Sequence, residues 1–387
     1  MNKKELELYI HIPFCVRKCS YCDFLSVPAT EQTREAYMAA LFAEIGGRAK
    51  DYSDRTVTSI FIGGGTPSLL SGEQIGQLMD RIREQFAMAQ DAEITMEVNP
   101  GTASAEKLRN FYTAGINRLS IGMQSAQAEE LKNLGRIHDF EGFCQVYREA
   151  VEAGFTNINV DIMSGLPGQT LASYRDTLEK VLHLEPMPQH ISAYSLIVEE
   201  GTPFAAMAER GELPLPEEET ERAMYEETIE VLAKYGFHRY EISNYARDGY
   251  ECRHNVGYWI RRDYLGFGIG AASLIDNVRF QNEKSLGAYL AHPLESREEE
   301  QTLTVQDRME ETMFLGLRLA RGVSCVDFAE QYGRTVEEVY GEVIARNVAD
   351  GLLTVTERKE NQKKDRFLAL TKRGLDLSNY VMAQFLF

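Results

Sequence analysis

The chain has 387 residues, with 41 Lys and Arg against 59 Asp and Glu, which gives a formal net charge of −18. At roughly 100–200 residues per domain, this length predicts two or three domains, or one barrel with an added unit. Apolar residues make up 44% of the chain, so disordered, collagen-like and disulfide-scaffold classes are excluded. The acidic surplus argues against a general nucleic-acid binder, because neutralising phosphates requires clustered Lys and Arg.

The sequence shows no evident signal peptide at its start and no evident membrane-spanning segment. The amino-terminal residues have no apolar stretch with a small-residue cleavage site, and no run of about 18 apolar residues occurs anywhere. We therefore expect a cytoplasmic protein without a transmembrane segment, and leave peripheral membrane contact open. Because thiols stay reduced in the cytoplasm, clustered cysteines indicate metal binding or catalysis in preference to disulfide bonds.

Short β-rich runs alternate with helical segments along the first 245 residues. Strands are predicted to begin near Glu5, Ser59, Ile94, Arg118, Asn157, His190 and Arg239, and helices to span 31–50, 72–86, 104–114, 139–153, 170–184 and 217–235. Three helices end at a glycine, as expected for left-handed C-terminal caps: Gly115, Gly154 and Gly236. The alternation predicts an α/β fold, a closed or partial (β/α) barrel with its chemistry at the carboxyl ends of the strands.

The pattern changes after about residue 290. Helices are predicted over 307–321, 324–332 and 336–349, followed by strands at Leu352–Thr356 and Phe367–Leu370 and a last helix from Thr371. This order predicts a winged-helix-like α+β unit. We place the barrel core in residues 1–245, a connecting segment in 246–295 and the C-terminal unit in 296–387. The basic turn Arg358–Arg373 is expected to belong to a packing unit sooner than to a DNA contact.

Three cysteines follow the first predicted strand with C-x3-C-x2-C spacing: Cys15, Cys19 and Cys22. Three thiolates on one loop can hold three corners of an iron–sulfur cube and leave the fourth iron open to another ligand. Zinc is the alternative, with His11 or Asp23 as a fourth ligand, although zinc knuckles usually come as two separated C-x2-C pairs. The other cysteines are scattered and are interpreted as ordinary buried residues: Cys144, Cys252 and Cys325.

Polar and glycine residues stand at the ends of later strands, where a core strand would place apolar ones. They are the turn Gly63–Thr66, Glu97, Gln124, Arg136 and Asp161. Glycines let backbone N–H groups approach a charged ligand, and a zwitterionic ligand with hydroxyls would satisfy the buried polar groups. The alternative is structural: an ion pair of Arg136 with Glu97 or Asp161.

In these motifs the chain resembles the radical S-adenosylmethionine (SAM) superfamily, whose cluster motif follows the first barrel strand. The lead-in Tyr9-x-His-Ile-Pro-Phe-Cys is similar to that of the oxygen-independent coproporphyrinogen oxidase branch, called HemN-like. This resemblance implies a 4Fe–4S cluster on the three cysteines, with SAM chelated at the open iron. It also implies which residues contact SAM: Tyr9, Tyr21, Gly64, Gly65, Thr66, Glu97, Gln124, Arg136 and Asp161.

Two departures from the oxidases narrow the resemblance. Oxidases of this branch carry a fourth cysteine where this chain has Phe24, and a longer segment before the cluster than the 14 residues found here. The HemW family of haem chaperones shares both differences, and also the H-N-x-x-Y-W motif seen at residues 254–259. A neutral imidazole is a normal axial ligand for haem iron. The resemblance therefore implies that His254 contacts haem, with Tyr258 and Trp259 beside the macrocycle.

The expected function is that of a haem chaperone, which binds haem, a 4Fe–4S cluster and SAM and delivers haem to respiratory acceptor proteins. One alternative is an anaerobic coproporphyrinogen III dehydrogenase. Another is a different radical SAM reaction on a tetrapyrrole. An electron donor is a further partner if SAM is cleaved, whereas nucleic acid is not expected to be one. Catalytic residues are left undefined, and so is whether the chain is an enzyme.

Overall fold

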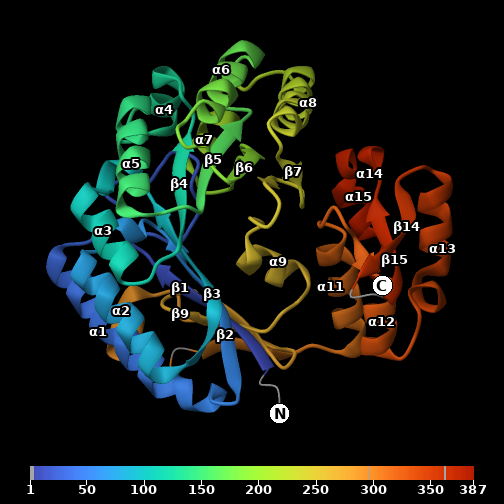
Figure 1. Ribbon diagram of the computed structural model, residues 1–387, viewed down its shortest axis with the longest axis horizontal. Coiled ribbons are helices and arrows are strands. Elements are labelled where there is room, and N and C mark those ends of the chain that lie inside the picture. Colours follow the sequence, from blue (N-terminus) through green and yellow to red (C-terminus); the bar gives the residue numbers. More distant parts are fainter. Residues whose placement is uncertain (1–3, 296, 361–362) are drawn as a thin grey trace.

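A curved sheet forms the centre of the molecule, and helices cover its outer face (Figure 1). The computed structural model describes residues 4–295, 297–360 and 363–387. Six strands run parallel in chain order: β1 (Lys4–Ile12), β2 (Arg55–Gly64), β3 (Ala87–Val98), β4 (Arg118–Gln124), β5 (Ile158–Ser164) and β6 (His190–Ser195). The predicted βαβ alternation is confirmed.

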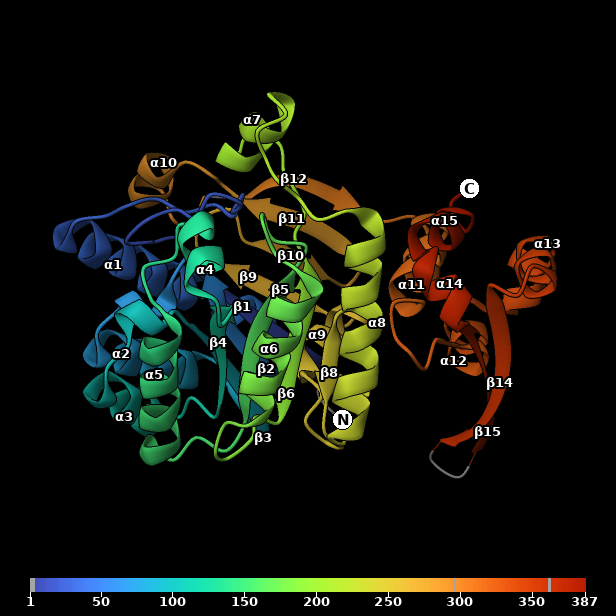
Figure 2. The same cartoon turned by 90° about the horizontal axis from the view of Figure 1, so that it is seen from above.

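The helices that connect these strands lie together on one side of the sheet (Figure 2). They are α1 (Glu31–Arg48), α2 (Gly72–Gln85), α3 (Ala105–Thr113), α4 (Ala128–Leu134), α5 (Phe140–Ala153) and α6 (Leu171–Leu182). Two more helices follow β6, namely α7 (Pro203–Glu209), which stands apart from the others in Figure 2, and α8 (Glu218–Lys234). Their ends follow local sequence signals. Ser71 and Gln74 form a reciprocal capping box that begins α2, and Gly154 ends α5 at φ 109°.

The sheet does not close into a full barrel. Next to β6 the chain forms the short antiparallel strand β8 (Asn244–Ala246), which in turn pairs with β7 (His238–Arg239). The seventh strand predicted from Arg239 is therefore present only as the two residues of β7, and it pairs with β8 and not with β6. Only two residues of that segment extend before it turns back, which is too short for another parallel strand. Beyond β1 the sheet continues through β9 (Tyr264–Phe267), β10 (Ala272–Ile275), β11 (Val278–Asn282) and β12 (Arg297–Thr302). The segment 246–295 therefore extends the sheet.

Alternation along β1 separates an apolar face from a polar one. Leu6, Leu8 and Ile10 are fully buried in the main hydrophobic core. The intervening side chains of Glu7 and Tyr9 point to the opposite side of the sheet, because successive side chains of a strand alternate. The inner side of the barrel is therefore polar and aromatic, and this side carries the chemistry.

The C-terminal unit has its own core. It contains α11 (Val305–Gly316), α12 (Cys325–Tyr332), α13 (Val336–Ala349), α14 (Lys372–Asp376) and α15 (Ser378–Ala383), with the strands β13 (Val323–Ser324), β14 (Leu353–Glu360) and β15 (Lys363–Leu370). Its buried apolar side chains form a cluster separate from that of the barrel. Much of the predicted basic turn belongs to the two long strands β14 and β15, and residues 361–362 at its tip lie outside the described residues.

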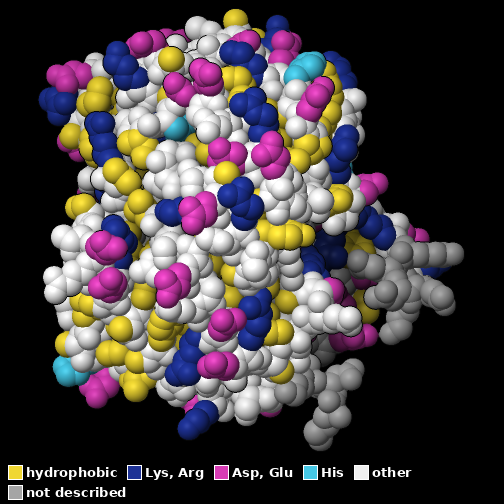
Figure 3. Space-filling view, turned by 60° about the vertical axis from the view of Figure 1, so that its left-hand side comes forward, with side chains coloured by type: hydrophobic (Ala, Val, Ile, Leu, Met, Phe, Trp, Pro, Cys, Tyr) yellow, Lys and Arg dark blue, Asp and Glu magenta, His cyan; other side chains and the backbone are white. Residues whose placement is uncertain are grey.

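The helices of the described residues can be tested for a membrane span. None of its helices combines the length and the apolar character that crossing a membrane requires. On the face shown in Figure 3, acidic and basic side chains are interspersed.

Candidate functional site

The loop after β1 brings the three predicted metal ligands to one cavity. Cys15, Cys19 and Cys22 all line a cavity of about 280 Å³ at the carboxyl ends of the strands. Hydrogen bonds hold the loop: the Cys15 N–H donates to the Val27 carbonyl at 3.2 Å, and the Cys22 N–H donates to the Cys19 carbonyl at 3.3 Å. Phe24 lies at the cavity with 64% of its surface exposed.

The positions of the three thiols distinguish between a single metal ion and an iron–sulfur cluster. Within the described residues, no three His, Cys, Asp or Glu side chains converge closely enough to hold a single ion. In an iron–sulfur cube each thiolate binds a different iron, so its ligands need not converge. The zinc alternative with His11 meets a second obstacle, because both ring nitrogens are engaged, Nδ1 with the Tyr9 hydroxyl and Nε2 with the Leu25 carbonyl.

The glycine turn after β2 forms a wall that only a residue without Cβ permits. A Cβ on Gly65 would lie 2.7 Å from the Phe14 carbonyl oxygen, and Gly64 adopts φ 109°. The Gly64 N–H donates to Oε2 of Glu97 at 3.0 Å, and the Thr66 hydroxyl lies 3.4 Å from Sγ of Cys15. The turn thus ties the cysteine loop to the acidic floor of the cavity.

Two carboxyl groups lie at the floor of the cavity. Burial, and then the nearby Asp161, raise the pKa of Glu97 to about 7, although the Gly64 N–H acts in the opposite direction. Burial also raises the pKa of Asp161, while hydrogen bonds from Asn159 and Ser120 oppose the shift. A cationic ligand group beside this pair would favour the ionised forms.

Gln124 and Arg136 form the opposite wall. A β-bulge between Gly122 and Gln124 redirects the end of β4, and Gln124 has φ 72°, a strained value for a residue other than glycine. Arg136 donates from Nη2 to the Gly122 carbonyl at 2.7 Å and approaches Sγ of Cys19 at 3.8 Å. Its Nε is buried without a hydrogen-bond partner. These contacts replace the ion pair with Glu97 or Asp161 that was the structural alternative.

Three further polar residues of this site were missed by the sequence analysis. The Tyr194 hydroxyl donates to Oε1 of Gln124 at 2.9 Å, while Ser120 and Asn159 hold Asp161. Tyr194 and Ser120 line the cavity, and Asn159 lies deeper. Polar residues that alternate within the strands β4, β5 and β6 were the available signal.

The cavity contains most, but not all, of the residues implied to contact SAM. Tyr21, Gly64, Gly65, Thr66, Glu97, Gln124, Arg136 and Asp161 line it together with the three cysteines. Tyr9 lies beside it inside the barrel, with its ring stacked on Phe61 and its hydroxyl 3.0 Å from Nδ1 of His11. The buried unpaired Nε of Arg136 fits a polar ligand beside a cluster.

Known proteins share this architecture. Residues 9–181 match the radical SAM superfamily and residues 303–377 match the HemN C-terminal domain. The haem chaperone HemW of Lactococcus lactis is 36% identical over 387 residues, covering 100% of this chain and 98% of that protein. The chain belongs to the HemW family. The HemW of Bacillus subtilis is 38% identical over 385 residues and covers 98% of each chain.

A solved structure agrees with the fold. Coproporphyrinogen III oxidase (HemN) of Escherichia coli, a radical SAM enzyme, superposes with a TM-score of 0.84 at 28% identity, covering 99% of this chain and 90% of that chain. The predicted fold class, a partial radical SAM barrel with an α+β C-terminal unit, is confirmed.

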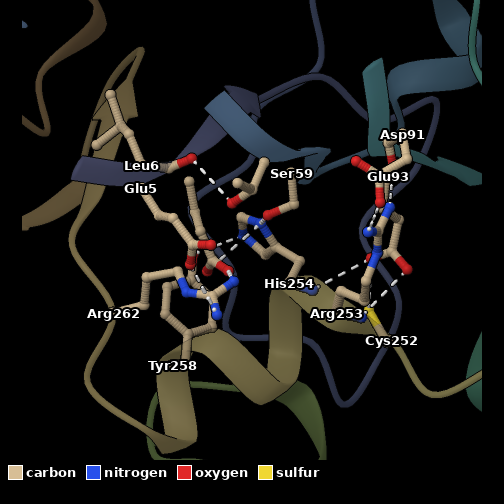
Figure 4. Close-up of polar contacts among 12 residues, drawn as sticks. Glu5, Leu6, Ser59, Asp91, Glu93, Cys252, Arg253, His254, Tyr258 and Arg262 are labelled. Atoms are coloured by element: carbon tan, nitrogen blue, oxygen red, sulfur yellow. Dashed lines mark hydrogen bonds and ion pairs between the residues drawn. The ribbon is translucent and has the colours of Figure 1, made fainter. Parts of the chain in front are cut away.

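The H-N-x-x-Y-W segment of this HemW-family chain lies away from the cavity. It forms the short helix α9 (Arg253–Trp259) on the inner side of the barrel (Figure 4). His254 is 1% exposed, its ring stacks on Phe61 and its Nδ1 lies 2.8 Å from the Ser59 hydroxyl. Ser59 precedes Gly64 by five strand residues, or roughly 16 Å. Burial, Arg118 and Arg262 lower the pKa of His254 to about 3, so the imidazole is neutral.

Cys252 adjoins this helix as its N-terminal cap residue. It is 1% exposed, and burial raises the pKa of its thiol to about 12. Its Sγ lies 3.5 Å from Oε1 of Glu93, to which it donates. A protonated, enclosed thiol of this kind is a poor nucleophile and a poor metal ligand.

Proposed function

We propose that the chain is a haem chaperone that holds a 4Fe–4S cluster on Cys15, Cys19 and Cys22 and binds SAM in the adjoining cavity. One observation carries the proposal: relatives that align with this chain from end to end are haem chaperones. The cavity supports it, because the cysteine loop, the glycine turn and the polar strand ends lie together. When bound, the cluster would supply an open iron for SAM and an electron for its reduction.

The side chains of the cavity have separate tasks in this proposal. The Gly63–Thr66 turn lines the cavity with backbone groups, and Gly65 lets the turn pack against the backbone of Phe14 and Ile12, where a Cβ would not fit. Glu97 and Asp161 receive the positively charged part of the ligand, and binding there draws a proton from Glu97, whose pKa is about 7. Arg136 contributes its unpaired Nε and holds the wall through the Gly122 carbonyl. Tyr21 and Tyr194 close the sides.

His254 is the proposed haem-contacting residue. The neutral form of an imidazole is the one that ligates iron, and an unperturbed histidine is mostly neutral at physiological pH. We expect His254→Ala to weaken haem binding at least about tenfold, since 1.4 kcal/mol of lost ligation already amounts to tenfold. Cluster absorbance should stay unchanged. The control is His183→Ala, at an exposed histidine bonded only to its own helix.

Titration of the anaerobically reconstituted protein with haem, followed by absorbance, measures this effect. Equal haem affinity in the His254→Ala variant and the wild type would remove His254 from the site. Failure of the wild type to bind haem at all would contradict the chaperone function itself.

Coproporphyrinogen dehydrogenation is the second candidate, favoured by the overall likeness to HemN. The exposed Phe24 side chain stands where oxidases of that branch carry a cysteine, which counts against it. An anaerobic assay with reductant, SAM and coproporphyrinogen III on the sample used for haem titration separates the two. Robust protoporphyrinogen formation would replace the chaperone assignment with the enzymatic one.

The remaining partners follow from this function. Haem would pass to haem-accepting respiratory proteins, and an electron donor would be required if SAM is cleaved. We place the chain in the cytoplasm, in keeping with reduced thiols at the cysteine loop.

A further inference from the structure

The helix that carries the H-N-x-x-Y-W motif is fastened to the barrel at its amino-terminal end. Oε1 and Oε2 of Glu93, on β3, accept the N–H groups of His254 and Arg253, both at 3.1 Å. The Arg253 side chain also pairs with Asp91 at 2.9 Å (Figure 4). Gly257 lies so close to Glu7 that a Cβ would stand 2.0 Å from its Oε1. The helix is thus wedged into the inner side of the sheet.

In this position His254 has no nitrogen available for a metal. Nδ1 lies 2.8 Å from the Ser59 hydroxyl and Nε2 lies 3.0 Å from the Tyr258 hydroxyl. The ring is enclosed, stacked on Phe61 and met edge-on by Tyr258. A macrocycle as wide as haem cannot reach a side chain that is 1% exposed. Ligation of haem by His254 therefore requires α9 to leave this position.

The opposite side of α9 is held by the C-terminal unit, next to which it lies (Figure 1). The guanidinium of Arg318, just after α11, stands 4.4 Å above the ring of Trp259. Nε of Arg261, just after α9, pairs with Oε2 of Glu311 on α11 at 2.9 Å, with 3% and 9% of the two side chains exposed. Arg279 holds the other oxygen of Glu311 at 2.8 Å.

The contacts between α9 and the C-terminal unit can break without unfolding either part. Only His254 and Gly257 of α9 are buried, so the helix contributes little apolar area to either core. The C-terminal unit has a hydrophobic cluster separate from that of the barrel, although Ile242 packs against it and Glu241 forms a β-bridge with Leu319. Units with separate cores can rotate about such a short connection without unfolding.

We propose that the C-terminal unit is a latch that holds α9 in the barrel, and that haem gains access to His254 only when the Arg318–Trp259 and Glu311–Arg261 contacts open. This inference rests on the proposed haem role of His254. It assigns to the C-terminal unit the control of haem uptake and release. An acceptor protein that displaced this unit would change the exposure of the haem ligand.

Arg318→Ala tests the latch by removing the stacked cation while leaving the buried Arg261–Glu311 pair intact. The control is Asp376→Asn, which breaks the 3.0 Å Arg222–Asp376 contact between α8 and the C-terminal unit away from α9. Arg318→Lys keeps the charge without the planar stack and should give an intermediate effect. Cluster incorporation and circular dichroism verify that each variant is folded.

Two measurements are compared. Hydrogen–deuterium exchange without haem reports the opening of α9 through the amides of residues 253–260, and stopped-flow absorbance reports haem association. For Arg318→Ala we expect both rates to rise roughly three- to tenfold, because apparent association scales with the open population. Asp376→Asn should match the wild type.

The outcomes separate this inference from the function on which it rests. Unchanged exchange in α9 of Arg318→Ala would overturn the latch. Faster exchange with unchanged haem association, in a protein that binds haem through His254, would also overturn it and leave the chaperone function standing. A wild type that binds no haem, or binds it equally well as His254→Ala, would refute the proposed site and the latch with it.

Discussion

Glu7 on β1 offers a quantitative test of the polar interior of the barrel. Its side chain is fully buried, and burial, opposed by Arg262, raises its pKa from 4.5 to about 8. The folded chain therefore keeps a proton on Glu7 that the unfolded chain releases above pH 4.5. The free energy of unfolding that Glu7 contributes at acidic pH, relative to an ionised Glu7, is lost as the pH rises toward 8.

The change that isolates this effect is Glu7→Gln, which resembles the protonated carboxyl and cannot ionise. Each pH unit between 4.5 and 8 lowers the free energy of unfolding of the wild type, but not of the variant, by about 1.4 kcal/mol. Between pH 5 and 8.5 the stability of the variant relative to the wild type should therefore rise by roughly 4 kcal/mol. Other titrating groups are common to both proteins and cancel in the difference. Denaturant unfolding, followed by fluorescence of the single tryptophan at both pH values, measures the gap.

Glu5→Gln is the matched control. Glu5 lies two residues away and contacts the same Arg262, at 3.1 Å, but its side chain is 56% exposed. Its stability relative to the wild type should hardly depend on pH, because exposed ion pairs contribute little. A gap for Glu7→Gln that is equal at pH 5 and 8.5 would refute the argument that a buried, protonated carboxyl lies inside the barrel.

Two further predictions concern the cavity. Cys19→Ala should abolish the absorbance of a reconstituted cluster, because it removes one of the three proposed cluster ligands. Cys144→Ala, at a partly buried helix residue far from the cysteine loop, should retain that absorbance. Loss of the absorbance in both variants would show that reconstitution depends only on folding. Gly65→Ala should lower SAM affinity at least about tenfold in equilibrium binding, since its Cβ would lie 2.7 Å from the Phe14 carbonyl and shift the turn. Gly76→Ala, where a Cβ meets open space, should leave affinity unchanged, and an equal loss in both variants would contradict the steric explanation.

Much of the barrel could be predicted because its signals are local. Strand alternation and the glycine at position 154 act within a few residues and appear in the fold as expected, and the capping box of Ser71 is equally local. The strand expected from Arg239 is present only as the two residues of β7, and it does not pair with β6, because pairing is a tertiary property. The later segment Asn244–Ala246 takes the place beside β6, and the residues near Arg239 do not by themselves determine which segment does so.

The candidate site shows the same division. The cysteine spacing and the glycine turn identified their residues, because both motifs act through neighbours in sequence. Asn159 and Tyr194 could not be predicted as site residues, because their role is to hydrogen-bond Asp161 and Gln124, and these contacts depend on how the strands lie side by side. The location of Tyr9 beside the cavity, rather than in it, likewise follows from packing on Phe61.

By itself, the sequence determined the chemistry that this protein can carry: three thiols on one loop, a turn without side chains, and a histidine in an H-N-x-x-Y-W motif. Only the tertiary structure decided which of these groups are accessible. The thiols line an open cavity because the ends of parallel strands meet at one edge of the sheet. His254 is enclosed because strands β2 and β3 and the C-terminal unit converge on α9 from different parts of the chain, and burial is a property of that convergence.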